Sequence, residues 1–294
     1  MRLAHFSDIH VTRFPLAGGF ALKRLAAVAS WGLAGRRRHF EGSDERIASL
    51  LAHVEAQQVD HALCTGDLTG VATEAELARA AELFGERLKQ PARWSVIPGN
   101  HDRYVPGAQG LFEKHFGALC EGASFPAVKH LPSGVTLVLL DSARPTSVID
   151  SSGLLGEEQR SKALSVLSDP SLKDRFVIVA LHYGLLRMTG RRDSRSHGLR
   201  DDLELMRLVD RDDVTVDLIV HGHLHRPFTI KTGRRTIINA GSATDLHMRC
   251  GYNLYDIDVA AKQVAVTRFW WNAQGGRYEP DAGHALNLTV RTRA

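Results

Sequence analysis

The chain has 294 residues, of which 44% are hydrophobic and 24% are charged, and its formal net charge is +4. This composition excludes an intrinsically disordered protein and allows one large domain or two small ones. The mild positive charge suits an anionic substrate or an acidic membrane surface, but it does not require nucleic acid.

The small number of cysteines and the lack of long apolar runs indicate where in the cell the protein resides. Cys64, Cys120 and Cys250 are too few for a disulfide scaffold, and a thiol inside an apolar run such as that around Cys64 usually packs as a small hydrophobe. The sequence shows no secretory signal segment and no run of about 18 apolar residues. We therefore expect a cytoplasmic protein without a membrane span.

Apolar runs predict strands, and helical patterns lie between several of them. The strands are expected at Arg2–Ser7, His61–Thr65, Arg93–Pro98, Thr136–Asp141, Phe176–Leu181 and Leu218–His221. The helices are expected at Asp44–Gln57, capped by Ser43 or Asp44, at Thr73–Lys89, opened by a Thr73 and Glu76 capping box, and at Gly156–Leu167 and Asp201–Asp210. This alternation indicates a layered α/β architecture.

The last quarter of the chain changes character. Short strands are expected at Pro227–Lys231, Thr236–Asn239, Tyr252–Val259 and Gln263–Trp271, and they could close a second sheet packed on the first. Beyond Gly275 the structure is left open. Because no linker or repeat is evident, we expect residues 1–294 to form a single domain.

Residue types that commonly bind metals in proteins follow five of the predicted strands. The fragments are Asp8-Ile9-His10, Gly66-Asp67, Gly99-Asn100-His101-Asp102, His182 and Gly222-His223-Leu224-His225. Alone, each has a plainer interpretation, such as a loop cap, a surface turn or a buried core histidine. Together, their carboxylates, imidazoles and amide oxygen suit two metal ions, and two-metal sites cleave phosphate esters.

The spacing suggests how the first fragments act. Asp8 and His10 are two residues apart, so in an extended segment both would point to one side and bind one ion. Gly66 would let the chain turn so that Asp67 faces inward, where its two oxygens could bridge metals roughly 3.5–4 Å apart. Asn100 would offer a neutral amide oxygen from a turn.

The last fragment is ambiguous. His221, His223 and His225 alternate, so they would share a direction if the segment stays extended. Gly222 could break that arrangement. We therefore do not assign all three as ligands.

Taken together, these motifs resemble those of the calcineurin-like metallophosphoesterase family over roughly residues 1–245. The family pattern is Asp-x-His, Gly-Asp, Gly-Asn-His-Asp/Glu, a lone His and Gly-His-x-His, and this sequence matches every element. The resemblance implies a four-layer αββα sandwich with a dinuclear metal site at strand ends. It also implies a metal-dependent phosphoric ester hydrolase that acts through a metal-bridging hydroxide.

The resemblance further implies a role for each site residue. The first metal would be bound by Asp8, His10 and His225, the second by Asn100, His182 and His223, and Asp67 would bridge the two. His101 would act as general acid or stabilise the transition state, with Asp102 holding its ring. A ligand set without thiolate suits two divalent ions of manganese, iron or zinc.

A basic amphipathic insertion at about 13–40 follows the first metal fragment. It combines an apolar arc, including Leu25 and Trp31, with the run Arg36-Arg37-Arg38. The insertion could cap the site or meet anionic lipid at the inner face of a membrane. The plainer alternative is a core-packed helix whose arginines complement its C-terminal dipole.

A second basic loop, Arg187–Arg200, follows His182 and could clamp a diphosphate or a second phosphate, or could simply be solvated.

We expect a phosphodiesterase rather than a phosphomonoesterase. Two substrates stay open: a cyclic nucleotide, as in class III phosphodiesterases, and a lipid-linked pyrophosphate, as in UDP-diacylglucosamine pyrophosphatases. Nucleic acid is not expected, because no track of interleaved aromatic residues is evident. A non-catalytic binding module of this fold should have lost ligands, and this sequence retains them all.

Overall fold

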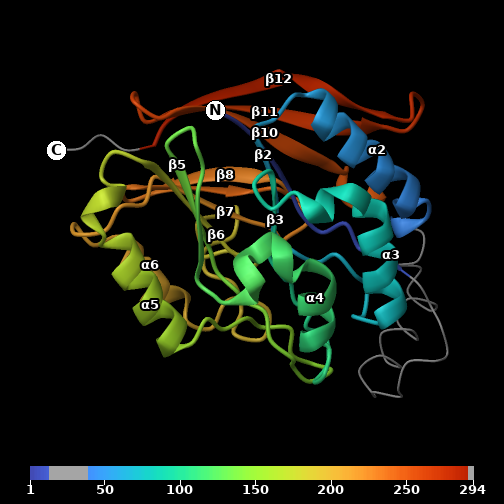
Figure 1. Cartoon of the computed structure of the whole chain (residues 1–294), viewed down its shortest axis with the longest axis horizontal. Helices are drawn as coiled ribbons and strands as arrows, with labels where there is room; N and C mark the ends of the chain where they lie inside the picture. The colour runs from blue at the N-terminus through green and yellow to red at the C-terminus, as the bar shows by residue number, and fades with distance from the viewer. Residues whose placement is uncertain (13–38, 291–294) are drawn as a thin grey trace.

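A computed structural model describes residues 1–12 and 39–290, which form two six-stranded sheets with helices around them (Figure 1). In spatial order, the first sheet consists of β12 (Arg277–Thr289), β11 (Gln263–Asn272), β10 (Gly251–Asp258), β1 (Arg2–Phe6), β2 (His61–Cys64) and β3 (Trp94–Val96). The second consists of β4 (Ala127–His130), β5 (Val135–Leu139), β6 (Phe176–Ala180), β7 (Leu218–His221), β9 (Arg235–Asn239) and β8 (Phe228–Thr232).

The longer helices lie outside this pair of sheets. They are α2 (Ser43–Ala56), α3 (Glu74–Phe84), α4 (Gln109–Phe116), α5 (Glu157–Leu167) and α6 (Asp202–Val209). The first of them packs against β12, whereas α5 and α6 share one apolar cluster with the second sheet. The expected α/β sandwich with helical outer layers is therefore confirmed.

The period of two along β6 explains this layering. Phe176, Ile178 and Ala180 belong to the apolar cluster that also contains the strands of the first sheet. Val177 and Val179, which point the other way, pack in the cluster with α5 and α6. Because both faces are covered, the strand reads as an uninterrupted apolar run.

Most expected elements are present with small shifts in their bounds. The capping box of α3 is confirmed, since the Thr73 side chain accepts from the Glu76 amide and the Glu76 carboxylate accepts from the Thr73 amide. That helix ends at Phe84, not at Lys89, because Gly85 leaves the helical conformation and a 3₁₀ turn follows. The residue before α2 is Gly42, so our expectation of a Ser43 or Asp44 cap was wrong.

The expectation that the last quarter closes a second sheet was also wrong. Its strands divide between the two sheets: β8 and β9 extend the second, while β10, β11 and β12 extend the first. The reason is that β1 has a free edge, along which β10 pairs antiparallel from Arg2 opposite Asp256. The strand β4 and the helix α4 were not expected, and β12 occupies the region that had been left open.

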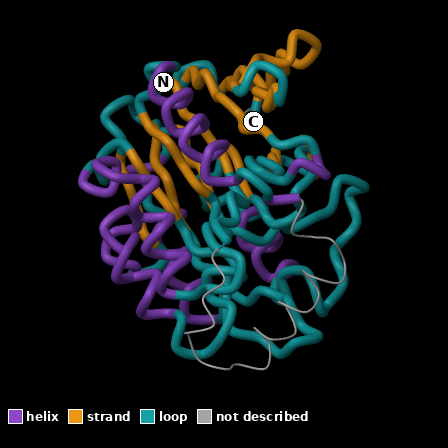
Figure 2. Tube along the Cα trace, turned by 90° about the vertical axis from the view of Figure 1, so that its right-hand side faces the viewer, coloured by secondary structure: helices purple, strands orange, loops and turns teal. Residues whose placement is uncertain are grey.

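Parallel pairing brings the metal-binding fragments to one end of the sandwich. The strands β1, β2 and β3 run parallel, and so do β5, β6, β7 and β9. Their carboxyl ends therefore meet at shared edges, and the connections that leave them appear as teal loops in Figure 2.

Within the described residues, no helix is both long and apolar enough to cross a bilayer. The insertion expected at 13–40 lies outside the described residues, except for His39 and Phe40.

Candidate metal centre

Four of the predicted ligands meet where three loops converge. Asp8 and His10 follow β1, Asp67 follows β2, and His225 follows β7. One potential ligand atom from each lies within 4.8 Å of the others, and His10 Nε2 is 3.1 Å from His225 Nε2. Carboxylate and imidazole groups at this separation can surround a single divalent ion.

The remaining predicted ligands form a second group that shares Asp67. The Asn100 Oδ1 atom lies 3.0 Å from His182 Nε2 and 3.0 Å from His223 Nδ1. Asp67 Oδ2 lies 3.4 Å from His182 Nε2 and 3.8 Å from His10 Nε2. Asp67 thus stands between the two groups, in the place that its predicted bridging role requires.

One buried atom shows that these residues suit a cation. Asp8 is fully buried, and its Oδ1 atom, although it lies 3.3 Å from His225 Nε2, makes no well-aligned hydrogen bond among the described residues. Its Oδ2 atom accepts from the His223 amide at 3.1 Å. A buried carboxylate oxygen without a donor is costly, and a metal ion would supply the missing partner.

Unusual backbone geometry places the ligands. The φ angles of Asp8, His10, Asp67, His223 and His225 are 55°, 42°, 55°, 69° and 52°, all left-handed. Such conformations in residues other than glycine are uncommon and concentrate at functional sites. The extended geometry that we expected for Asp8 and His10 is therefore wrong, and two left-handed turns bring these side chains together instead.

Two glycines allow the loops to approach closely. A Cβ atom on Gly99 would overlap the Asp67 carboxylate, and one on Gly222 would overlap the Ser7 hydroxyl and the Asp8 carboxylate. Gly66, whose φ is 98°, provides the turn expected before Asp67.

Each predicted histidine ligand is held through its other ring nitrogen. His10 Nδ1 contacts Thr69 O at 3.1 Å, His182 Nδ1 contacts Thr65 O at 2.7 Å, His223 Nε2 contacts His197 O at 3.0 Å, and His225 Nδ1 contacts Asp245 Oδ2 at 2.9 Å. Because an acceptor must receive a proton, these contacts fix which nitrogen carries hydrogen and leave the other facing the site. His225 differs from the others, since its partner is a carboxylate.

The predicted histidine ligands differ in pKa, which is raised for some of them and lowered for others. Burial opposes the charged form of His225, but its hydrogen bond to Asp245 and its attraction to the Asp8 carboxylate outweigh that effect and raise its pKa to about 10. Likewise, Asp67 outweighs burial and raises the pKa of His182 to about 9. At His10 burial dominates and lowers the pKa to about 3. Because a metal binds neutral imidazole, an ion entering near neutral pH must displace protons from His182 and His225.

His101 lies beside this centre, but Asp102 does not hold its ring as we expected. The His101 Nδ1–H donates to Gly70 O at 2.5 Å, and the ring stacks on Tyr104. Asp102 instead accepts from the backbone amides of Leu68, Thr69 and Gly99 and from the Thr69 hydroxyl. Its carboxylate points to these amides and so ties the loop after β2 to the loop after β3.

His221, which was not assigned, is kept out of the centre. Its ring is fully buried, contacts Gly222 O at 2.9 Å, and lies where a Cβ on Gly184 would be. The chain therefore does not stay extended from His221 to His225, in agreement with the break that Gly222 suggested.

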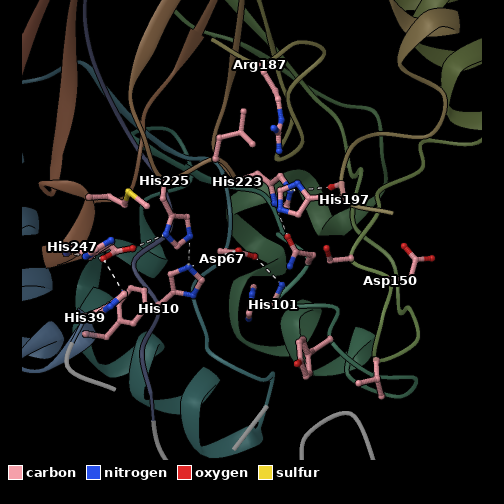
Figure 3. Close-up of a pocket in the computed structure, with 18 residues that line it drawn as sticks. His10, His39, Asp67, His101, Asp150, Arg187, His197, His223, His225 and His247 are labelled. Atoms are coloured by element: carbon pink, nitrogen blue, oxygen red, sulfur yellow. Dashed lines mark hydrogen bonds and ion pairs between the residues drawn. The ribbon is translucent and has the colours of Figure 1, made fainter. Parts of the chain in front are cut away.

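A cavity of about 500 Å³ opens over these residues. Figure 3 shows His39 and His247 on the side of His10 and His225, and Arg187, His197 and Asp150 on the side of His223. Arg187 and His197 belong to the basic loop Arg187–Arg200, and His39 belongs to the insertion at about 13–40, whereas Asp150, Asp245 and His247 were missed by the sequence motifs. The spacing of Asp245 and His247, two residues apart in a loop, was a signal that could have pointed to them.

A pair of carboxylates, an amide and four histidines at the strand ends of such a sandwich define a candidate dinuclear metal hydrolase. The chain belongs to the calcineurin-like phosphoesterase family, whose profile matches residues 1–227. The expected family is confirmed, and the chain is accordingly a metal-dependent phosphoester hydrolase by family. A comparison with curated protein sequences found no match.

Solved structures share the fold at low sequence identity. A dimetal phosphatase from Danio rerio has a TM-score of 0.66 and 12% identity, over 90% of this chain and 94% of that one. The purple acid phosphatase PPD1 from yellow lupin (Lupinus luteus) seeds has a TM-score of 0.55 and 12% identity, over 95% of this chain and 52% of that one. At these identities, the likeness establishes the fold alone.

Proposed function

We propose that this protein hydrolyses a phosphodiester or pyrophosphate bond with two divalent metal ions. The observation that carries the proposal is the convergence of both predicted ligand groups on Asp67, with the buried Asp8 Oδ1, which makes no well-aligned hydrogen bond, inside the first group. Asp8, His10 and His225 would hold one ion, Asn100, His182 and His223 the other. When bound, two such ions would offset phosphate charge and lower the pKa of water.

We assign proton transfer to His101. Its Nδ1–H is committed to Gly70 O, so only Nε2 is available to pass a proton to the leaving oxygen. The His101 amide also donates to Asp67 Oδ1 at 2.8 Å, which fixes the position of the residue relative to the candidate bridging ligand. Asp102 acts on this arrangement indirectly, through the two loops that it joins.

The shape of the cavity supports a diester or diphosphate over a monoester. The cavity extends to both sides of the metal-binding residues, toward His39 and His247 on one side and toward Arg187 and His197 on the other. A substrate phosphorus with a group on each side would use this space, whereas a monoester carries only one group. Its volume of about 500 Å³ lies in the range of small-molecule sites.

Two substrate classes follow. A cyclic nucleotide is small enough for the cavity. A lipid-linked pyrophosphate is favoured by exposed apolar side chains in two segments that line the cavity. Val148 lines it, and Ile149 and Met188, which directly follow the lining residues Val148 and Arg187 in the sequence, are 91% and 51% exposed. For this second class we propose a cytoplasmic enzyme in peripheral contact with the inner membrane face.

The test compares bis-p-nitrophenyl phosphate with p-nitrophenyl phosphate after reconstitution with manganese, iron or zinc. Faster cleavage of the diester, lost in a folded Asp67→Ala variant, is expected. Faster cleavage of the monoester would contradict the preference for diesters. If metal-loaded protein cleaves neither compound nor a soluble diphosphate diester, the proposed function is wrong.

A further inference from the structure

A buried carboxylate arranges two cationic or donor groups at one end of the cavity. Asp193 Oδ1 lies 3.0 Å from Arg187 Nη2, and Asp193 Oδ2 lies 2.8 Å from His197 Nδ1. The Asp193 side chain is only 7% exposed, whereas those of Arg187 and His197 are 53% and 41% exposed. Asp193 thus works as an anchor, and the groups that it holds reach the cavity.

This arrangement is adjacent to the candidate metal centre. The His197 ring lies 4.4 Å from that of His223, and His197 O contacts His223 Nε2 at 3.0 Å. In Figure 3 the Arg187 side chain extends toward His223 and His197. A group attached to a phosphate at the metal centre would therefore meet Arg187 and His197 on this side.

The hydrogen-bonding capacity on this side exceeds what Asp193 uses. Among the described residues, the Arg187 guanidinium pairs only with Asp193 and through Nη2, while a guanidinium has five N–H donors. The nearby carboxylate of Asp150 is already engaged by Arg200 at 2.7 Å and by the Ser152 amide at 2.9 Å. Donors therefore outnumber unengaged acceptors here, which suits an anionic ligand group.

We propose that Arg187 and His197, held by Asp193, form a subsite for a second phosphoryl group, so that the substrate is a diphosphate diester. This inference rests on the proposed function and selects within it, because a cyclic nucleotide has a single phosphate and would leave the subsite without a ligand. A planar guanidinium matches two phosphate oxygens at once.

The reaction is then hydrolysis of the P–O–P bond. Water supplies the oxygen of the new P–O bond, and the second phosphate leaves with the electron pair of the broken bond. The two protons of water are shared between the products and solvent, giving two phosphate monoesters. Arg187 and His197 would bind the departing phosphate, whose charge increases as the bond breaks.

The experiment measures kcat/KM for UDP-glucose, a soluble diphosphate diester, and for bis-p-nitrophenyl phosphate, which has one phosphate. We expect Arg187→Ala to lower the value for UDP-glucose about tenfold more than the value for bis-p-nitrophenyl phosphate. Arg187→Lys, which keeps the charge but loses the planar fork, should fall between. Arg195→Ala is the matched control: it removes an exposed arginine of the same loop that does not line the cavity, and it should change neither value.

Binding gives a second readout. Inorganic pyrophosphate should inhibit cleavage of bis-p-nitrophenyl phosphate more strongly than inorganic phosphate does, and Arg187→Ala should remove that difference. Equal losses on both substrates in Arg187→Ala would overturn the subsite. Cleavage of bis-p-nitrophenyl phosphate without cleavage of UDP-glucose, and without preferential inhibition by pyrophosphate, would also overturn it while the proposed function stands.

Discussion

Asp245 Oδ2 lies 2.9 Å from Nδ1 of His225, and within residues 1–12 and 39–290 it is the one carboxylate that supports a predicted histidine ligand through its second nitrogen. Asp245 is itself fixed, because its backbone amide donates to Ser242 Oγ and its Oδ1 accepts from the His247 amide. A carboxylate partner increases the basicity of an imidazole and fixes its orientation. Residue 245 lies beyond the part of the chain that matches the family profile.

Replacing Asp245 should therefore weaken metal binding at the group formed by Asp8, His10 and His225. We expect Asp245→Ala to lower the affinity for manganese or zinc by about 10–100-fold. Asp245→Asn should lower it less, because an amide oxygen can still accept from His225. Titration against a chromogenic chelator measures this affinity. Asp213→Asn, in an exposed pair with Arg211, is the control, and equal affinity in all three variants would contradict the role of Asp245.

Proton release on metal binding should report the raised pKa values of His182 and His225. Both groups are protonated near pH 7, since their pKa values are about 9 and about 10, and a metal binds only the neutral ring. Affinity for metal should increase as pH rises toward these values. Calorimetry in two buffers of different ionisation enthalpy should show close to two protons released at pH 7. The variant His225→Gln should release about one fewer, and no proton release by the unmodified protein would contradict these pKa shifts.

The same pKa shifts predict how stability depends on pH once metal is removed. A histidine whose pKa is raised on folding contributes stability that is complete below its unfolded pKa of about 6.5. That contribution is lost as pH rises through the folded values of about 9 and about 10. Chelated protein should therefore lose thermal stability between about pH 6.5 and pH 10. A midpoint that stays constant over this window, measured by calorimetry, would count against the ion pairs of His182 and His225.

Substitutions of the neighbouring residues His101 and Asp102 should have different effects, the first on turnover and the second on stability. His101→Ala should keep metal binding but lose about 10²–10⁴-fold in turnover of a diester with a poor leaving group. A near-normal rate on that substrate would remove His101 from proton transfer.

Asp102→Asn should instead reduce stability. The amide group cannot accept from all the donors that the carboxylate serves, which are the backbone amides of Leu68, Thr69 and Gly99 and the Thr69 hydroxyl. Leaving one buried donor without a partner costs about 1–3 kcal/mol. Urea unfolding of Asp102→Asn beside His101→Ala tests this, and equal stability of the two variants would contradict it.

The sequence was informative where local chemistry decides the structure. Strand ends place Asp67 and Asn100 at one edge of the sheet. The glycines before them, Gly66 and Gly99, are needed because a Cβ atom at either position would overlap the neighbouring loop. The Asp102 contacts were not predictable, because they depend on how the loop after β2 meets the loop after β3. The same holds for Asp245 and Asp193, whose partners are distant in sequence or lie in irregular loops.

The sheet that each strand joins was harder to predict from the sequence than the position of the strand along the chain. The local pattern of Tyr252–Val259 reports a strand, but its partner, β1, lies about 250 residues earlier in the chain. Only the tertiary fold shows which sheet edge is open to it. For the same reason, the amphipathic pattern of the insertion cannot by itself reveal what its apolar side contacts.

The loops that carry the candidate ligands come from different sheets. Asp8, His10 and Asn100 follow strands of the first sheet, whereas His182, His223 and His225 follow strands of the second. Each ion in the proposed arrangement would therefore be bound from both sheets at once. Metal binding would then resist sliding of one sheet over the other. Conversely, a core substitution that changes the spacing of the sheets would weaken metal binding without touching a ligand.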